Sequence, residues 1–176
     1  MSVEPRILLL RGVNVGGHRV LPMADLRALL TGMGLQDVQT HIQSGNAVFR
    51  AATPEGLAST IPAAIATRFG FAPEAVILTR AALSEVLAQN PFAQADPGRV
   101  LIGFLARPSG ADPATLAALA APDEHCALTP AAFYLHAASG IGRSKLAQAA
   151  ERLLGVPTTF RNLRVATALA TLAERL

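Results

Sequence analysis

The sequence predicts an α+β protein in which one order of strands and helices occurs twice. Apolar residues that recur every three or four positions mark helices, and short apolar runs rich in β-branched residues mark strands. Both halves of the chain place these elements in the order β-α-β-β-α-β, which is the ferredoxin-like pattern. We therefore expect a first ferredoxin-like repeat at residues 1–79, a linking helix and loop at 80–99, and a second repeat with a C-terminal helix at 100–176.

The first repeat begins with an apolar strand at residues 6–11, and a glycine-rich loop follows it. Its other predicted elements are, in order, a helix at residues 22–33, strands at 38–43 and 47–50, a helix at 57–69 and a strand at 75–79. Pro22 favours the first turn of its helix, whereas Gly56 and Pro62 should kink the later helix or delay its start. The small polar residues at 44–46 are typical of a tight hairpin turn.

The linking helix at residues 81–89 ends where Asn90-Pro91 interrupts the helical pattern. The predicted elements of the second repeat are a strand at residues 100–106, a helix at 113–121, strands at 125–128 and 132–136, a helix at 143–154 and a strand at 158–160. Asp112 is the expected N-cap of the helix that follows it. A last helix starts near Asn162 and carries apolar residues at helical spacing.

Composition predicts a protein that folds around apolar cores without disulfide bonds. Apolar residues make up 51% of the chain, and the single cysteine, Cys126, is expected to be a buried strand residue. No run reaches the roughly 18 apolar residues that a membrane-spanning helix needs, and the first residues do not form a signal peptide. We therefore expect a cytoplasmic protein without a membrane partner.

The charge of the chain gives only weak support for a polyanionic partner. The isoelectric point is near 10.0, but the formal net charge is only +3. Lys145 is the only lysine in a chain that otherwise uses arginine. Its compact ammonium group acts differently from a planar guanidinium, so its position within a glycine-containing loop is of interest.

The predicted topology brings polar residues of each repeat together at one end of its sheet. The first and second strands of such a sheet run in the same direction, so the loop after the first strand lies beside the turn after the second. In the second repeat, the loop after the third strand lies at the same end as the residues after the fourth. The candidate ligand-binding residues of these two clusters are Arg11, Asn14, Gly16, Gly17, His18, Ser44, Asn46, Arg143, Ser144, Lys145, Arg161 and Asn162.

The two clusters contain no Asp or Glu, and their charge therefore favours an anion. Residues 140–145 precede a helix, where glycines and a helix start both direct backbone N–H groups toward an anion. Neither loop has the spacing of a P-loop or of the dinucleotide-binding fingerprint. Two plainer explanations stay open, namely that Gly16 and Gly17 only form a tight turn and that Ser144 only caps its helix.

Metal and nucleophilic chemistry find less support in the sequence. The four histidines do not form metal-ligand pairs with carboxylates, so neither a metal nor another cofactor is expected. Ser44 and His18 belong to one cluster, but they lack the acidic partner of a hydrolase triad. Whether the protein is an enzyme, and in which oligomeric state it exists, is left open by the sequence.

Five segments resemble those of an uncharacterised bacterial family known as DUF1697. They are Arg11-Gly12-Val13-Asn14-Val15-Gly16-Gly17, Ile42-Gln43-Ser44-Gly45-Asn46, Asn90-Pro91-Phe92, Gly142-Arg143-Ser144-Lys145-Leu146 and Arg161-Asn162. His41 stands where the family often has a tyrosine. The resemblance implies an α/β protein whose polar motifs coincide with the two clusters, and it implies no particular activity.

The favoured hypothesis is that a small anionic ligand, bearing a phosphate or a carboxylate, binds in one basic cleft between the repeats. The alternative is a nucleic-acid-binding protein that contacts the phosphate backbone. The aromatic residues Phe49, Phe104, Phe133 and Tyr134 are too scattered for the aromatic pairs with which RNA-recognition sheets stack on bases. An assembly module without a ligand is a third hypothesis, because sheets of this kind expose edge strands.

Overall fold

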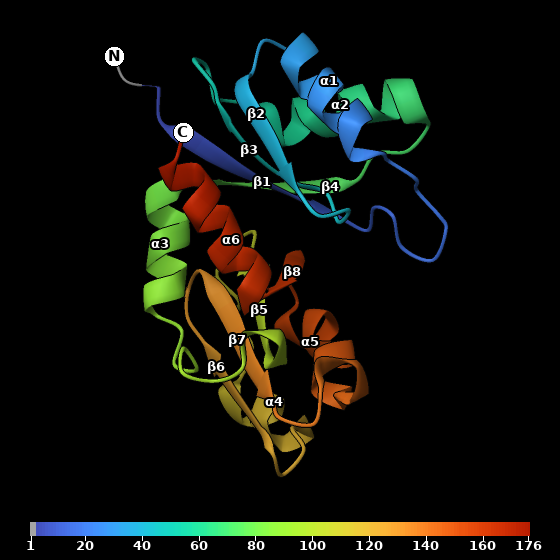
Figure 1. The fold of residues 1–176 in the computed structure, drawn as a ribbon. Coiled ribbons are helices and arrows are strands. Elements are labelled where there is room, and N and C mark those ends of the chain that lie inside the picture. Colours follow the sequence, from blue (N-terminus) through green and yellow to red (C-terminus); the bar gives the residue numbers. More distant parts are fainter. Residues whose placement is uncertain (1–2) are drawn as a thin grey trace. The chain divides into compact units, whose positions relative to one another are not determined.

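The computed structural model describes residues 3–176 and has a mixed α+β architecture with two four-stranded antiparallel sheets (Figure 1). The described residues form eight strands and six α-helices, in an order consistent with two repeats. The chain divides into two compact units, which are Met1–Ser84 with Ala168–Leu176, and Glu85–Thr167. None of the helices in the described part of the chain is both long and apolar enough to span a bilayer.

The first unit contains a sheet with the strand order β2-β3-β1-β4. Its elements are β1 (Pro5–Arg11), α1 (Met23–Gly32), β2 (Gln36–His41), β3 (Asn46–Arg50), α2 (Leu57–Phe69) and β4 (Glu74–Thr79). The central strand β1 pairs antiparallel with both β3 and β4, and β2 pairs antiparallel with β3. Residues 6–9 of β1 pair with a strand on each side, and this central position in the sheet accompanies the almost complete burial of residues 7–10.

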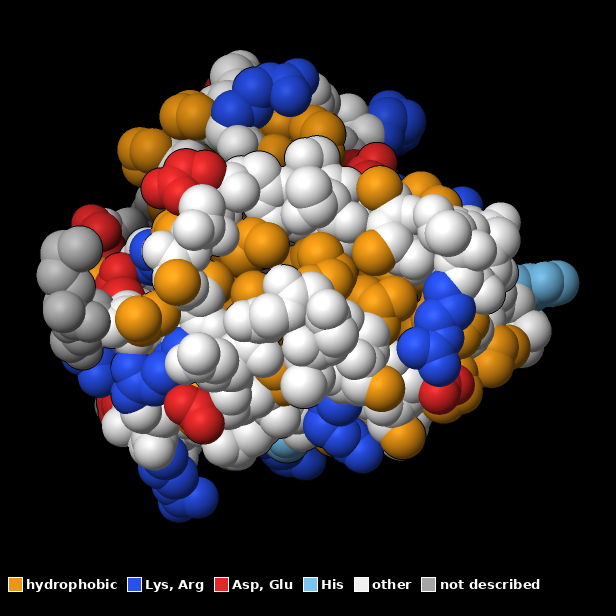
Figure 2. Space-filling model, turned by 90° about the horizontal axis from the view of Figure 1, so that it is seen from above, with side chains coloured by type: hydrophobic (Ala, Val, Ile, Leu, Met, Phe, Trp, Pro, Cys, Tyr) orange, Lys and Arg blue, Asp and Glu red, His pale blue; other side chains and the backbone are white. Residues whose placement is uncertain are grey.

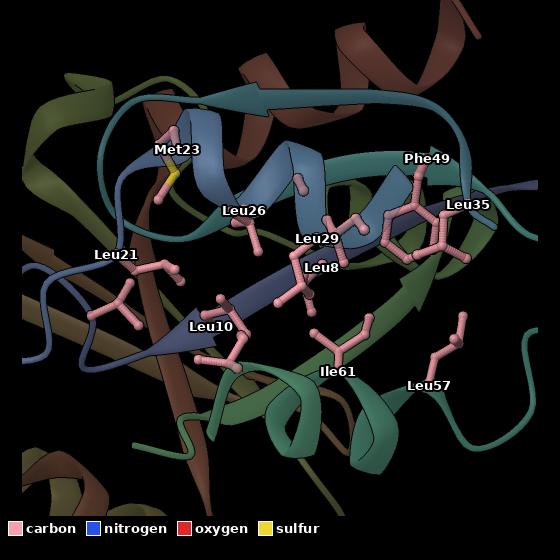
Figure 3. Close-up of a cluster of buried hydrophobic side chains, with 14 of the residues drawn as sticks. Leu8, Leu10, Leu21, Met23, Leu26, Leu29, Leu35, Phe49, Leu57 and Ile61 are labelled. Carbon is pink, nitrogen blue, oxygen red and sulfur yellow. The ribbon is translucent and has the colours of Figure 1, made fainter. Parts of the chain in front are cut away.

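The core of this unit lies between one face of the sheet and the helices α1 and α2 (Figure 3). Leu26 of α1 and Ile61 of α2 point toward Leu8 and Leu10 of β1, and each of these side chains is at most 1% exposed. Burying one such side chain contributes roughly 1.5–3 kcal/mol. The helical spacing of the apolar residues thus selects the face that each helix turns to the sheet.

The second unit contains a sheet with the strand order β6-β7-β5-β8. Its strands are β5 (Val100–Leu105), β6 (Glu124–Leu128), β7 (Ala132–Ala137) and β8 (Thr158–Asn162). Its helices are α4 (Pro113–Leu119) and α5 (Lys145–Leu154), and it also contains the 3-10 turns Pro97–Arg99 and Ile141–Arg143. Two further helices, α3 (Arg80–Ala88) and α6 (Leu163–Glu174), each include residues of both units. Leu116, Phe133, Leu135 and Leu146 belong to one buried cluster, which joins α4 and α5 to the sheet.

The observed elements begin and end within two residues of the predicted ones, but the first hairpin turn is shifted. The turn occupies residues 42–45, and Asn46 is the first residue of β3, where it pairs with Leu9 and His41. The expected delay of α2 is also wrong, because the helix begins at Leu57 and continues past Pro62. The apolar contacts of Ile61 and Ile65, both fully buried, outweigh the single helical hydrogen bond that a proline removes.

Gly45 provides a test of how closely the first loop packs against the hairpin turn. An added Cβ atom would lie 2.6 Å from Cγ2 of Val13 and 2.8 Å from Cβ of Leu10, and the residue has a φ of +77°. Gly45→Ala should lower the free energy of unfolding by roughly 1–2 kcal/mol for the backbone strain and by about another 1–3 kcal/mol for the overlap. Gly70→Ala is the matched control, since Gly70 has a φ of +79° but no atom within 4 Å of the added Cβ. Urea denaturation that gave equal losses for the two variants would contradict this packing.

Candidate functional site

The glycine-rich loop after β1 folds as a small hairpin. Val15 and His18 form an isolated antiparallel bridge, and the amide of His18 donates a 3.0 Å hydrogen bond to the carbonyl of Val15. Gly16 and Gly17 occupy the two central positions with φ values of +59° and +76°, the combination that type I′ turns require. These two glycines therefore serve the tight turn, which is the plainer of the explanations that the sequence left open.

The Asn14 side chain ties this hairpin to its surroundings. Its Oδ1 accepts a 2.7 Å hydrogen bond from the amide of Leu21, and its Nδ2 donates to the carbonyls of Leu21 (2.8 Å) and Gln43 (2.7 Å). The bonds to Leu21 close the loop at its far end, and the bond to Gln43 joins it to the turn between β2 and β3. The expectation that this loop and this turn lie side by side is confirmed.

Ser44 and Asn46 stabilise the hairpin turn itself. Asn46 is completely buried, and its Nδ2 donates to Oγ of Ser44 (2.8 Å) and to the carbonyl of His41 (3.1 Å). A buried amide needs such partners, because an unmade hydrogen bond costs about 1–3 kcal/mol. These hydrogen bonds give both residues a role in folding, and their predicted contact with a ligand stays a prediction.

A hollow of about 320 Å³ lies at the end of β1, and we call it the Arg19 hollow. It is lined by Arg11, Gly12, Arg19, Ala72 and Glu74. Arg11 and Glu74 are opposite residues of β1 and β4, and Nη1 of Arg11 lies 2.6 Å from Oε2 of Glu74. The expectation of a cluster far from carboxylates is wrong here, because strand pairing adds one that the loop sequence does not contain.

Arg19 differs from Arg11 in having no carboxylate partner. Nη1 of Arg19 would lie 3.5 Å from a Cβ atom added to Gly12, so the guanidinium covers that glycine. The side chain is exposed, and it has no hydrogen bond or ion pair with the part of the chain that the structure describes. Its five N–H donors are therefore available to solvent or to a ligand.

In the second unit, two of the predicted ligand-binding residues cap helices. Oγ of Ser144 accepts a 3.0 Å hydrogen bond from the amide of Ala147 at the start of α5, and Ser144 is only 2% exposed. Oδ1 of Asn162 accepts a 2.9 Å hydrogen bond from the amide of Val165 at the start of α6. Each N-cap contributes about 0.5–2 kcal/mol to stability, which explains these residue types without a ligand.

Arg143 and Lys145 line a second hollow, of about 390 Å³, which we call the Lys145 hollow. Its other lining residues are Ala118, Leu119, Ala120, Ala121 and Glu124. The carbonyl groups at the C-terminal end of α4 carry partial negative charge, and cations near such an end stabilise a helix by about 0.3–1 kcal/mol. Glu124 adds a full negative charge to the lining of the same hollow, so negative charge lies near the two cations within their own unit.

Arg161 does not share a sheet face with the helix that Lys145 begins. It pairs with Ile102, so its side chain lies on the face of Ile102 and Tyr134, whereas α5 packs against the opposite face. Burial lowers the pKa of the Arg161 guanidinium to about 10, which leaves it charged at neutral pH. Its Nη1 donates a 2.8 Å hydrogen bond to the carbonyl of Phe160.

Three charged residues at these loops were not identified from the sequence, namely Asp123, Arg99 and Glu74. Ser139 donates hydrogen bonds from its Oγ and its amide to the carboxylate of Asp123, and the Oγ bond is the main cause that lowers the pKa of Asp123. Nη1 of Arg99 would lie 3.0 Å from a Cβ atom added to Gly140. Of these, only Glu74 had an indication in the sequence, because it begins the predicted strand that pairs with β1.

The described residues contain no group of three or more His, Cys, Asp or Glu side chains that could hold a metal ion. Cys126 lies on β6 and is partly exposed rather than fully buried. Burial, with a smaller contribution from Glu124, raises the pKa of its thiol and so disfavours the reactive thiolate.

One solved structure is similar to this chain in fold. A solved structure described as that of the conserved bacterial protein SP0830 from Streptococcus pneumoniae is similar, with a TM-score of 0.72 and 24% sequence identity. The similarity covers 97% of this chain and 98% of that one, and at this identity it concerns the fold alone. No curated protein matched the chain.

A family model described as "Protein of unknown function (DUF1697)" matches residues 3–134. This range includes β1, the loop with Asn14 and Arg19, and Glu74, so the Arg19 hollow lies entirely within the matched part. The chain therefore belongs to the DUF1697 family.

Proposed function

We propose that the protein binds a small anionic molecule and that the Arg19 hollow holds its anionic group. The observation that carries the proposal is the Arg19 guanidinium, which lines a hollow and has no protein partner among residues 3–176. A guanidinium matches the oxygen spacing of carboxylate and phosphate groups through paired N–H donors. Gly12 lies under Arg19, so no side chain separates the guanidinium from the backbone there.

The size of the hollow favours a small molecule. Ligand pockets usually measure about 300–1,000 Å³, and the Arg19 hollow, at about 320 Å³, lies at the lower end of that range. A dissolved small anion is also compatible with the cytoplasmic location that the sequence predicts.

The loop that carries Arg19 is held in place before any ligand arrives. Asn14 makes three hydrogen bonds to neighbouring backbone groups, and Val13 is 2% exposed. A loop whose backbone is already ordered loses less conformational entropy when a ligand binds, which increases affinity. This rigidity supports a binding role for the loop over a purely connecting one.

We further infer that each sheet, with its packed helices, is a ferredoxin-like unit. The orders β2-β3-β1-β4 and β6-β7-β5-β8 put the first strand of each unit between its third and fourth strands. This arrangement brings the loop after the first strand beside the following hairpin turn. The position of the Arg19 loop then follows from the topology of the unit.

Nucleic-acid binding through a sheet face receives less support than a small anion. Phe49, Phe104, Phe133 and Tyr134 are each at most 2% exposed, so these rings are not available to stack on bases. On the face drawn in Figure 2, the Lys and Arg side chains lie in separate groups among uncharged ones, and some lie beside Asp or Glu. A backbone binder instead needs a stripe of cations that follows the phosphates.

Arg19→Ala should weaken the binding of the best anion found by thermal-shift screening of phosphates and organic acids. The loss of one charge-assisted contact is worth roughly 1.5–3 kcal/mol, or about a tenfold to hundredfold rise in Kd measured by isothermal titration calorimetry. The melting temperature should hardly change, because the side chain is exposed and unpaired.

Arg80→Ala is the matched control for this variant. Arg80 is also exposed and has no partner among the described residues, and it follows Thr79, at the end of β4 remote from Glu74. It should bind the anion as the wild type does. Equal affinity of Arg19→Ala and the wild type, or stabilisation by no anion at all, would overturn the proposal.

The sequence also predicts that the residues around Lys145, in the second unit, bind an anion. Lys145→Ala should then raise its Kd about tenfold or more in the same titration, since a charge-assisted contact is lost. Full affinity in this variant would confine the ligand to the Arg19 hollow. Lys145 would then serve only to stabilise the C-terminal end of α4.

A further inference from the structure

The Arg19 hollow presents a hydrogen-bond acceptor as well as donors. Glu74 is 60% exposed at its side chain, and its Oε2 accepts from Nη1 of Arg11 at 2.6 Å. Its second oxygen, Oε1, has no hydrogen-bond partner within residues 3–176. An ionised carboxylate oxygen accepts strongly from N–H groups, above all from a charged ammonium.

The charges of the hollow do not favour a ligand with two negative charges and no positive charge. Arg11 and Glu74 form an ion pair and compensate each other, so the lining side chains of the hollow carry one net positive charge, that of Arg19. A phosphate monoester with two negative charges would exceed that charge and would lie near the Glu74 carboxylate. Like charges a few ångströms apart repel each other even at the surface of a protein.

We infer that the hollow binds a zwitterionic small molecule, with its anionic group on the Arg19 guanidinium and its ammonium group on Oε1 of Glu74. This inference rests on the proposed function and narrows the class of ligand. The ammonium removes the repulsion from Glu74 and satisfies the acceptor. A molecule with both groups, whether amino phosphate or amino acid, matches the donor and acceptor that the hollow offers.

Arg11 acts as the positioning residue of this arrangement. Its guanidinium holds Oε2 of Glu74 at 2.6 Å across the paired strands β1 and β4. The carboxylate is therefore oriented by a rigid sheet rather than by a mobile loop. Arg19 comes from the loop that Asn14 fixes, so the backbone that carries each of the two groups is ordered in advance.

The test uses pairs of probes that differ only in the ammonium group. O-Phosphoethanolamine is compared with ethyl phosphate, and β-alanine with propionate, by calorimetric titration of the full-length protein. The wild type should bind the amino member of at least one pair about tenfold more tightly than its partner. The pair that shows the preference identifies the anionic group as a phosphate or a carboxylate.

Glu74→Gln should abolish that preference. In this variant the amino probe should bind about tenfold more weakly, whereas the probe without an ammonium should bind more tightly, because the repelling charge is gone. General damage to the hollow would instead weaken both probes, and this outcome would count against the inference. Glu4→Gln, which removes a carboxylate that lies 2.7 Å from Arg6, is the matched control and should keep the wild-type preference.

The outcomes separate this inference from the proposed function. If no probe binds in an Arg19-dependent manner, the proposed function fails and the inference fails with it. If both members of each pair bind the wild type equally and Arg19→Ala weakens them, the proposed function stands and the zwitterion is excluded. A preference that persists in Glu74→Gln would also overturn the assignment of the ammonium to that carboxylate.

Discussion

The Asn14 carboxamide is the interaction on which the candidate site depends. Three backbone groups, two of Leu21 and one of Gln43, share its donor and acceptor atoms at 2.7–2.8 Å. Asn14 also has a φ of +54°, a conformation that asparagine tolerates better than most residues. One side chain thus closes the loop after β1, joins it to the β2–β3 turn and fixes the direction in which the loop presents Arg19.

Much of the fold could be predicted from the sequence because each element has a strong local signal. The apolar spacing of α1, the leucine run of β1 and the Asp112 cap, whose Oδ1 accepts from Ala114 at 3.2 Å, all appear in the structure. The shift of the first turn could not be predicted. The residue types at 44–46 favour a turn, but pairing and complete burial of Asn46 decide where the strand resumes.

The site was less predictable, since its charges come from elements far apart in the sequence. Arg11 and Glu74 meet only through the register of β1 and β4, which local patterns do not specify. Knowing the register of the antiparallel pairing between the first and fourth strands would have placed Glu74 opposite Arg11. The glycines and caps were ambiguous for another reason, since turn formation and anion binding call for the same residue types at the same places.

An NMR titration of the ¹⁵N-labelled protein with O-phosphoethanolamine tests whether the ligand binds in the Arg19 hollow. We predict that the backbone amides of Gly12, Arg19 and Glu74 shift together and saturably as the ligand is added. Shifts confined to residues 140–145, with Gly12 and Arg19 unaffected at saturation, would contradict the assignment of the ligand to the Arg19 hollow.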